Sequence, residues 1–245
     1  AVGRAPETES VMPDSRERIL GNLRRSLRRG SAEDTAAEAV RARLGEHRAN
    51  TIPARATDLD RDGRIQLFQA MAEEVAATIA HVTSLDDVPG AIADYLARHN
   101  LPSDMVVTQE PELDPIPWAQ RPTLTPRKGV ATGDDLVGVT GAFAAVAETG
   151  TLMLVSGPGM ATRNNFLPDN HIVVLRADQI VPSYEEGWER LRALKTLTDG
   201  KFTMPRTVNF ITGPSRTADI ELKIELGAHG PRRLHILIVD DAPGD

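Results

Sequence analysis

The sequence predicts an α/β fold in which helices flank a buried sheet, and three observations support this fold class. Aromatic residues make up 4% of the chain, so the core must consist of Ala, Val, Leu and Ile, which suits a sheet covered by helices. Segments with helical periodicity alternate with short apolar runs typical of strands. At 245 residues, the chain is long enough to bury a sizeable core.

Residues 1–55 are predicted to form an N-terminal helical arm and linker, followed by an α/β domain over residues 56–245. Within the arm, residues 14–29 place aliphatic side chains on one stripe and arginines on most of the remainder, and a second helix is expected to run from Ser31 to about Arg48. The arm has few large apolar residues, so we expect it to pack on the main domain or on another chain. Its arginines form either a solvated face or a docking surface for an anionic partner.

The first part of the domain is expected to contain two helices, a strand and a long connection. Helical spacing covers residues 65–79 and recurs over 88–96, which predicts two helices on either side of residues 84–87. Residues 105–108 are typical of a strand. Five prolines then predict an extended connection over 111–126 that covers an edge or a site.

The second part of the domain is rich in strand patterns that mix hairpins with crossovers. Strands are expected at 137–140, 143–149, 151–156 and 171–176, and a helix at 184–197. Continuous apolar runs at 208–212 and 234–239 predict fully buried strands that complete the sheet.

Between these two runs, apolar and charged residues alternate over 220–226, which predicts a half-buried strand. Residues 227–233 would then form a hairpin loop back to 234–239. A helical turn over 215–219 is also compatible with the pattern.

Composition excludes several classes of function. A formal net charge of −7 argues against nucleic-acid binding, which usually needs a basic face. The chain has no cysteine, so it can form no disulfide, use no thiolate in catalysis and hold no iron–sulfur cluster through its own thiolates. Any such cluster must belong to a partner. No run of about 18 uninterrupted apolar residues and no leader pattern is present, which predicts a cytoplasmic protein without a membrane span.

The first candidate site is the turn at Glu148, where one carboxylate lies in apolar surroundings. A desolvated carboxylate must be hydrogen-bonded, raised in pKa, or both, which suits a base or a nucleophile. The alternative is a buried glutamate that only satisfies backbone donors.

The second candidate site is the loop Gly-Pro-Ser-Arg-Thr-Ala-Asp at 213–219, which follows a predicted strand. Loops at strand ends of α/β sheets often bind ligands, and Arg216 could pair with a carboxylate or phosphate while Gly213 lets the backbone approach. A structural turn with a local ion pair is the alternative. His171 and His229 are the other titratable groups in unusual settings, but their spacing gives no support to a metal site.

Four motifs together resemble the LUD (lactate utilisation) family. They are Glu-Thr-Gly-Thr at 148–151, Leu-Pro-Asp-Asn-His at 167–171, the 213–219 loop and Gly-Ala-His-Gly-Pro at 227–231. Their order is that of the family, and the N-terminal arm is also similar to that of its C-type chains. One departure is Ala228, where the family pattern has valine.

The resemblance implies a fold related to the NagB, RpiA and CoA-transferase group, with a central, mostly parallel sheet, antiparallel hairpins and flanking helices. It also implies a role in oxidising L-lactate to pyruvate together with iron–sulfur protein subunits, in which this chain is a non-redox subunit that binds a small carboxylate or its partners. By analogy with CoA transferases, Glu148 would be catalytic. The expected ligand-binding residues are Thr149, Gly150, Thr151, Asn165, His171, Gly213, Ser215, Arg216, Thr217, Asp219, His229 and Gly230. An independent isomerase or acyl-transfer enzyme for an anionic substrate is the alternative function.

Overall fold

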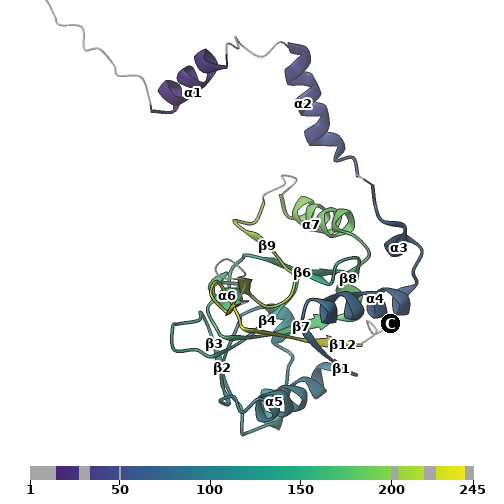
Figure 1. Cartoon of the computed structure of the whole chain (residues 1–245), viewed down its shortest axis with the longest axis vertical. Helices are drawn as coiled ribbons and strands as arrows, with labels where there is room; N and C mark the ends of the chain where they lie inside the picture. The colour runs from purple at the N-terminus through teal and green to yellow at the C-terminus, as the bar shows by residue number, and fades with distance from the viewer. Residues whose placement is uncertain (1–14, 28–33, 50, 200–203, 218–224, 241–245) are drawn as a thin grey trace, which may run out of the picture. The chain divides into compact units, whose positions relative to one another are not determined.

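The computed structural model describes residues 15–27, 34–49, 51–199, 204–217 and 225–240 (Figure 1). The chain divides into two compact units, residues 1–49 and residues 50–245. The short helix α3 (Ala54–Thr57), in the segment expected to be a linker, belongs to the second unit.

The described residues of the first unit form two helices, as the periodicity predicts. They are α1 (Ser15–Ser26) and α2 (Asp34–Glu46). Helix α1 buries none of its residues, and Ile19 and Leu23 on its apolar stripe are 57% and 51% exposed. The expectation that this stripe packs on another surface stays a prediction.

A six-stranded, fully parallel sheet forms the centre of the second unit. Its strands in spatial order are β1 (Thr78–Val82), β12 (Arg233–Val239), β7 (Asn170–Arg176), β4 (Val137–Gly141), β2 (Asp104–Val107) and β3 (Thr125–Lys128). The buried runs at 137–140, 171–176 and 234–239 therefore form adjacent central strands, as expected for parallel strands covered on both faces.

The other strands among the described residues form two smaller sheets, although their apolar patterns predict that they complete one sheet. The larger contains, in order, β8 (Ile180–Val181), β5 (Ala144–Val146), β6 (Thr151–Val155) and β9 (Val208–Ile211). Its β5–β6 and β6–β9 pairs are antiparallel. The smaller is a hairpin of β10 (Arg216–Thr217) and β11 (Glu225–Leu226).

Apolar cores cover both faces of the central sheet, because its strands alternate their side chains between the two. On one face, Ile172 of β7 packs with Ile92 of helix α5 (Val88–Arg98). On the other, Val173 packs with Phe68 of helix α4 (Arg61–Glu74) and with Leu152 of the four-stranded sheet. Figure 1 shows α5 on one side of the sheet and α4 on the other.

Two further helices complete the second unit. Helix α7 (Tyr184–Asp199) packs Leu191 on Met153 of the four-stranded sheet. Helix α6 (Arg163–Phe166) is a single turn before β7. No helix among the described residues combines the length and apolar character needed to cross a membrane.

The prediction of one helix over residues 65–79 is wrong at its end. Helix α4 stops at Glu74, and Ala76 adopts a left-handed conformation with φ of 67°. Thr78–Val82 then forms β1, which pairs in parallel with β12 along its whole length. Ile79 fits the helical spacing of the preceding segment, but pairing with a distant strand decides its conformation.

The proline-rich connection also contains a strand that the sequence analysis missed. Residues Thr125–Lys128 form β3 at the edge of the central sheet, in parallel register with β2. Pro126 is tolerated there because an edge strand leaves one row of backbone groups unpaired. The connection was expected to cover an edge or a site; its residues 125–128 form the edge strand itself, and Pro111 and Glu112 line a cavity.

The expected hairpin between residues 220–226 and 234–239 is wrong where the structure describes it. Leu226 pairs with Arg216, while β12 lies between β1 and β7. Arg216–Thr217 is accordingly a strand, not a helical turn. Residues 218–224, including Asp219, lie outside the described residues. The strand β9 was expected to be fully buried, but it lies at a sheet edge with Phe210 37% exposed.

Candidate functional site

Most of the predicted ligand-binding residues line one cavity of about 250 Å³, here called the His171 cavity. The predicted residues on its wall are Asn165, His171, Gly213, Ser215, Arg216, Thr217, His229 and Gly230. They come from helix α6, the amino end of β7, the loop after β9 together with strand β10, and the turn before β12. The cavity therefore opens beside the amino ends of central strands and not at the carboxyl edge of the central sheet. Its 213–217 loop follows β9, which is an antiparallel strand of the four-stranded sheet.

His171 is the buried polar group of this cavity. Its side chain is fully enclosed, at 1% exposure, and Nε2 lies 2.8 Å from Oγ1 of Thr140. Burial lowers the pKa of His171 to about 4, so the imidazole is neutral at neutral pH. Nδ1 has no hydrogen-bond partner among the described residues. Because the Thr140 hydroxyl can donate to Nε2 or accept from it, Nδ1 can present either a proton or a lone pair.

Ser215 joins the two loops that form the mouth of the cavity. Its backbone N–H donates to the carbonyl of Pro231, and its own carbonyl accepts from the N–H of Gly227. Its Oγ accepts from the N–H of His229 at 3.3 Å. The hydroxyl proton is not used in that contact, so Ser215 can donate it to a ligand.

Gly213 and Arg216 attach this loop to the end of helix α4. Gly213 has φ of 76°, and a Cβ atom there would lie 2.4 Å from the carbonyl oxygen of Val75. Nη2 of the exposed Arg216 donates to the same oxygen at 3.0 Å. Part of the guanidinium is thus structural, as the alternative interpretation of this loop expected, and its other N–H groups make no hydrogen bond to described residues.

Glu148 lies elsewhere, in a turn that fastens strands to helices. The residue is 5% exposed, Oε1 accepts from the N–H of Tyr184 at 3.3 Å, and its carbonyl accepts from Nη2 of Arg55 at 2.6 Å. Glu148 does not line the His171 cavity. Its contacts match the alternative in which a buried glutamate satisfies backbone donors.

The other predicted ligand-binding residues of this turn are also engaged in contacts within the protein. Gly150 has φ of 63°, and a Cβ atom there would lie 2.3 Å from the backbone nitrogen of Ala72 in α4. Oγ1 of Thr151 lies 2.7 Å from Oγ1 of Thr149 and 2.7 Å from Oγ1 of Thr212. The hydroxyls satisfy one another, and Thr212 links them to the loop of the His171 cavity.

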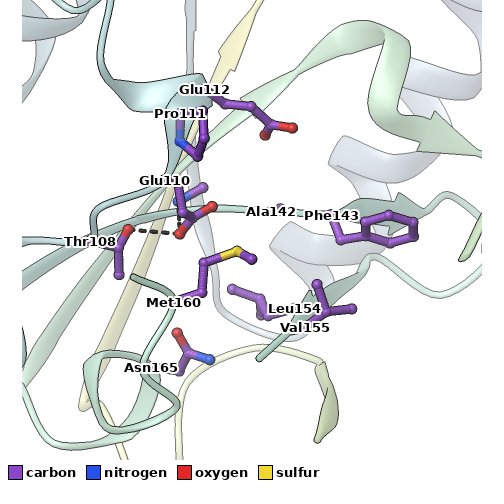
Figure 2. Close-up of a pocket in the computed structure, with 11 residues that line it drawn as sticks. Thr108, Glu110, Pro111, Glu112, Ala142, Phe143, Leu154, Val155, Met160 and Asn165 are labelled. Atoms are coloured by element: carbon purple, nitrogen blue, oxygen red, sulfur yellow. Dashed lines mark hydrogen bonds between the residues drawn. The ribbon is translucent and has the colours of Figure 1, made fainter. Parts of the chain in front are cut away.

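A second cavity, of about 130 Å³, contains a residue that the sequence analysis missed. Glu110 follows β2 at the carboxyl edge of the central sheet and is 7% exposed. Its Oε1 accepts from Oγ1 of Thr108 at 2.7 Å and from the N–H of Gly141 at 3.2 Å, and Figure 2 shows the Thr108 contact. Burial is the main cause of a raised pKa of this carboxyl group. Its position just after an apolar strand was a signal that could have found it.

Comparison with known proteins then places the chain in a family. The LUD domain model matches residues 132–239. Lactate utilization protein C of Deinococcus radiodurans is 32% identical over 190 residues, which cover 74% of this chain and 82% of that protein. The chain belongs to the LUD-domain family. A crystal structure of a DUF162 family protein from the same organism superposes with a TM-score of 0.55 at 26% identity, covering 74% of this chain and 99% of that one.

Other LUD-domain relatives match over a shorter stretch. Lactate utilization protein C of Macrococcus caseolyticus is 33% identical over 105 residues, and that of an Exiguobacterium species is 37% identical over the same length. These alignments cover 43% of this chain and 44% of each relative, so the chain matches less than half the length of these relatives.

The matched LUD domain contains the His171 cavity and the Glu148 turn, whereas Glu110 precedes it in the sequence. The described residues of this LUD-domain chain contain no group of three or more histidine, aspartate or glutamate side chains placed to hold a metal ion.

Proposed function

We propose that this chain is a non-redox subunit of a system that oxidises L-lactate to pyruvate, and that its His171 cavity binds a small carboxylate. The observation that carries the proposal is that the neutral His171 lines this cavity and that its buried Nδ1 has no hydrogen-bond partner among the described residues. Relatives named lactate utilization protein C support the choice of ligand and pathway.

Recognition of a hydroxy or keto acid would be divided between charge and hydrogen bonding. The free N–H groups of Arg216 would meet the carboxylate at the mouth of the cavity, since a guanidinium pairs well with two oxygens. The hydroxyl of Ser215 would donate to the same group. His171, which is neutral, would contact the oxygen on the second carbon of the ligand.

His171 suits both members of the lactate and pyruvate pair. When Nε2 carries the proton and donates to Thr140, Nδ1 accepts from the hydroxyl of lactate. When Thr140 donates to Nε2, Nδ1 carries the proton and donates to the carbonyl of pyruvate. The exchange requires only a rotated hydroxyl and a shifted ring proton.

Electron transfer would belong to other subunits. The chain has no cysteine, and therefore iron–sulfur clusters held by thiolates are assigned to partner proteins. Reconstitution tests this part: lactate oxidation by the iron–sulfur partners should depend on the chain. Full activity of the partners alone would reject the proposal.

Calorimetric titration tests the binding site directly. L-lactate and pyruvate should bind saturably, whereas lactamide, which lacks the negative charge, should bind much more weakly. Arg216→Gln should weaken lactate binding by roughly tenfold, the usual effect of losing a hydrogen bond to a charged group. Arg163→Gln, which changes an exposed arginine outside the cavity, is the control and should bind as the unmodified chain does.

Two outcomes would contradict the binding proposal. One is lactamide binding as tightly as lactate, and the other is no saturable heat with either acid at millimolar concentration. Mass spectrometry after incubation with acyl-CoA distinguishes the acyl-transfer alternative, because that reaction requires a covalent adduct on Glu148.

A further inference from the structure

Glu110 is a buried carboxyl group that the carboxylate site does not use. The backbone on both sides of it is fixed, since the N–H of Gln109 donates to Gly159 and the carbonyl of Glu110 accepts from the N–H of Leu113. The carboxyl group is therefore presented to the cavity from a rigid position. Such preorganisation is typical of ligand-binding and catalytic groups.

The second carboxyl oxygen of Glu110 is free. Oε1 accepts both hydrogen bonds, from Thr108 and Gly141, and Oε2 makes none to the described residues. Gly141 provides the room for Oε2, because a Cβ atom at that position would lie 2.5 Å from it. Figure 2 shows one oxygen of Glu110 directed to Thr108 and the other directed away.

The walls of this cavity are mainly apolar. Phe143, Leu154, Val155 and Met160 line it together with Asn165 and the rim residue Glu112 (Figure 2). No lysine, arginine or histidine is among the described residues that line it. An anion would therefore meet two carboxyl groups and no positive charge, and the apolar walls would make a bare cation costly to desolvate.

The same surroundings favour the protonated form of Glu110. Burial raises its pKa most, the hydrogen bonds from Thr108 and Gly141 lower it, and the charge of Glu112 raises it further. A protonated carboxyl can donate a hydrogen bond, and an ionised one can accept one. Glu112 is the other titratable group on the wall of this cavity.

We propose that the Glu110 cavity binds the uncharged, hydroxyl- or carbonyl-bearing part of a small ligand with an apolar body, through a hydrogen bond to Oε2 of Glu110. This site does not depend on carboxylate binding by the His171 cavity. Asn165 lines both cavities, so the two sites are neighbours.

Methyl NMR of the full chain tests the proposal with simple probes. Met160 lines the cavity, and its ¹³C-labelled methyl signal can be assigned with Met160→Leu. Titration with 2-butanol or 2-butanone should shift this signal saturably. Butyrate and butylamine, which have a similar apolar body and a charge, should not.

Variants of Glu110 separate binding from folding. Glu110→Leu should weaken binding of 2-butanol roughly tenfold, while thermal melting reports whether the variant folds. Asp114→Asn is the matched control, because it removes a negative charge from an exposed residue paired with Lys128 nearby. This control should bind 2-butanol as the unmodified chain does.

Glu110→Gln keeps the shape of the side chain and tests the role of the proton. Binding of 2-butanone by the unmodified chain should weaken as pH rises and Glu110 loses its proton, since the ketone can only accept. The glutamine variant should bind it with little dependence on pH.

Three results would overturn the proposal. They are a Met160 signal that fails to shift saturably with either neutral probe, tighter binding of butylamine or butyrate than of 2-butanol, and 2-butanol binding unchanged in a folded Glu110→Leu variant. Preference for butylamine, with weaker binding after Glu112→Gln, would identify a site for cations instead.

Discussion

At the scale of single residues, two histidines of this protein are buried without an oppositely charged partner among the described residues. His171 and His235 lie on central strands and both have their pKa lowered to about 4, mainly by burial. His235 also stacks on Tyr95 with ring centroids 4.1 Å apart. Both imidazoles are therefore kept neutral. Of the two, only His171 lines a described cavity, and its fully buried Nδ1 has no hydrogen-bond partner among the described residues.

The buried histidines predict that stability falls in mild acid. An unfolded histidine binds a proton as pH falls through 6.5, whereas these two bind one only near pH 4. The unfolded state therefore binds more protons between these values, and the free energy of unfolding decreases as pH falls. Each should contribute a loss of roughly 2 kcal/mol between pH 7 and pH 5. Urea denaturation at the two pH values measures it.

His235→Gln should make the free energy of unfolding depend less on pH, because it removes one of the two buried imidazoles. A free energy of unfolding that is constant between pH 5 and pH 7 would contradict this account of the two buried rings.

The close approach of Gly150 to helix α4 predicts a second residue-scale effect. Gly150→Ala should lower the free energy of unfolding by at least about 2 kcal/mol, because its φ is positive and Cβ would collide with backbone atoms of Ala72. Gly133→Ala, where a Cβ would meet no atom within 4 Å, should change stability by less than about 0.5 kcal/mol. Chemical denaturation compares the two, and equal effects would refute the packing argument.

At the scale of elements, the sequence predicted a strand correctly where its own residues form a continuous apolar run. It failed where pairing with a distant strand determines the backbone conformation. Strands β7 and β12 were predicted from their apolar runs alone. Strand β1 was missed because Ile79 continues the helical spacing of α4, and β3 because Pro126 argues against a strand. In both cases, hydrogen bonds to a strand distant in the sequence override the local preference.

Helix α4 supports both the Glu148 turn and the loop of the His171 cavity, so its start should matter to stability. Oδ1 of Asp60 accepts from the N–H of Gly63 at 2.8 Å and caps this helix. Asp60→Ala should lower the free energy of unfolding by about 1 kcal/mol, and Asp60→Asn should retain most of it. Asp58→Ala, outside the cap, should have little effect in the same denaturation assay. Equal losses at both positions would show that the cap does not stabilise the helix.

At the scale of the whole molecule, all three apolar cores of the described structure consist of residues between 65 and 239. The first unit contributes none of them. Because none of these core residues lies in the first unit, a chain that lacks the N-terminal helices can test where the folded domain begins.

A chain that begins at residue 50 should fold by itself. Its melting temperature should lie within about 2 °C of that of the full chain, because no core residue is lost. Differential scanning calorimetry measures this. Loss of a cooperative transition would show that the first unit is required for the fold.

The sequence predicted most residues of the His171 cavity but not the separate position of Glu148. The motifs at 167–171, 213–219 and 227–231 drew attention to residues that the structure brings into the His171 cavity. Glu148 was expected to be catalytic beside the ligand-binding residues Arg216 and His229, but it lies in a separate turn. The order of motifs along a sequence does not fix which of their side chains meet across a cavity.

The sequence by itself determined the fold class, the helical first unit, the buried central strands and the absence of cysteine. These follow from composition and from periodicity within a segment, which local geometry converts directly into helix or strand. Only the tertiary structure decided that the strands form separate sheets, that His171 retains a free nitrogen and that Glu110 lies in an apolar cavity. Pairing partners and desolvation are set by contacts between distant segments, and a local pattern cannot specify them.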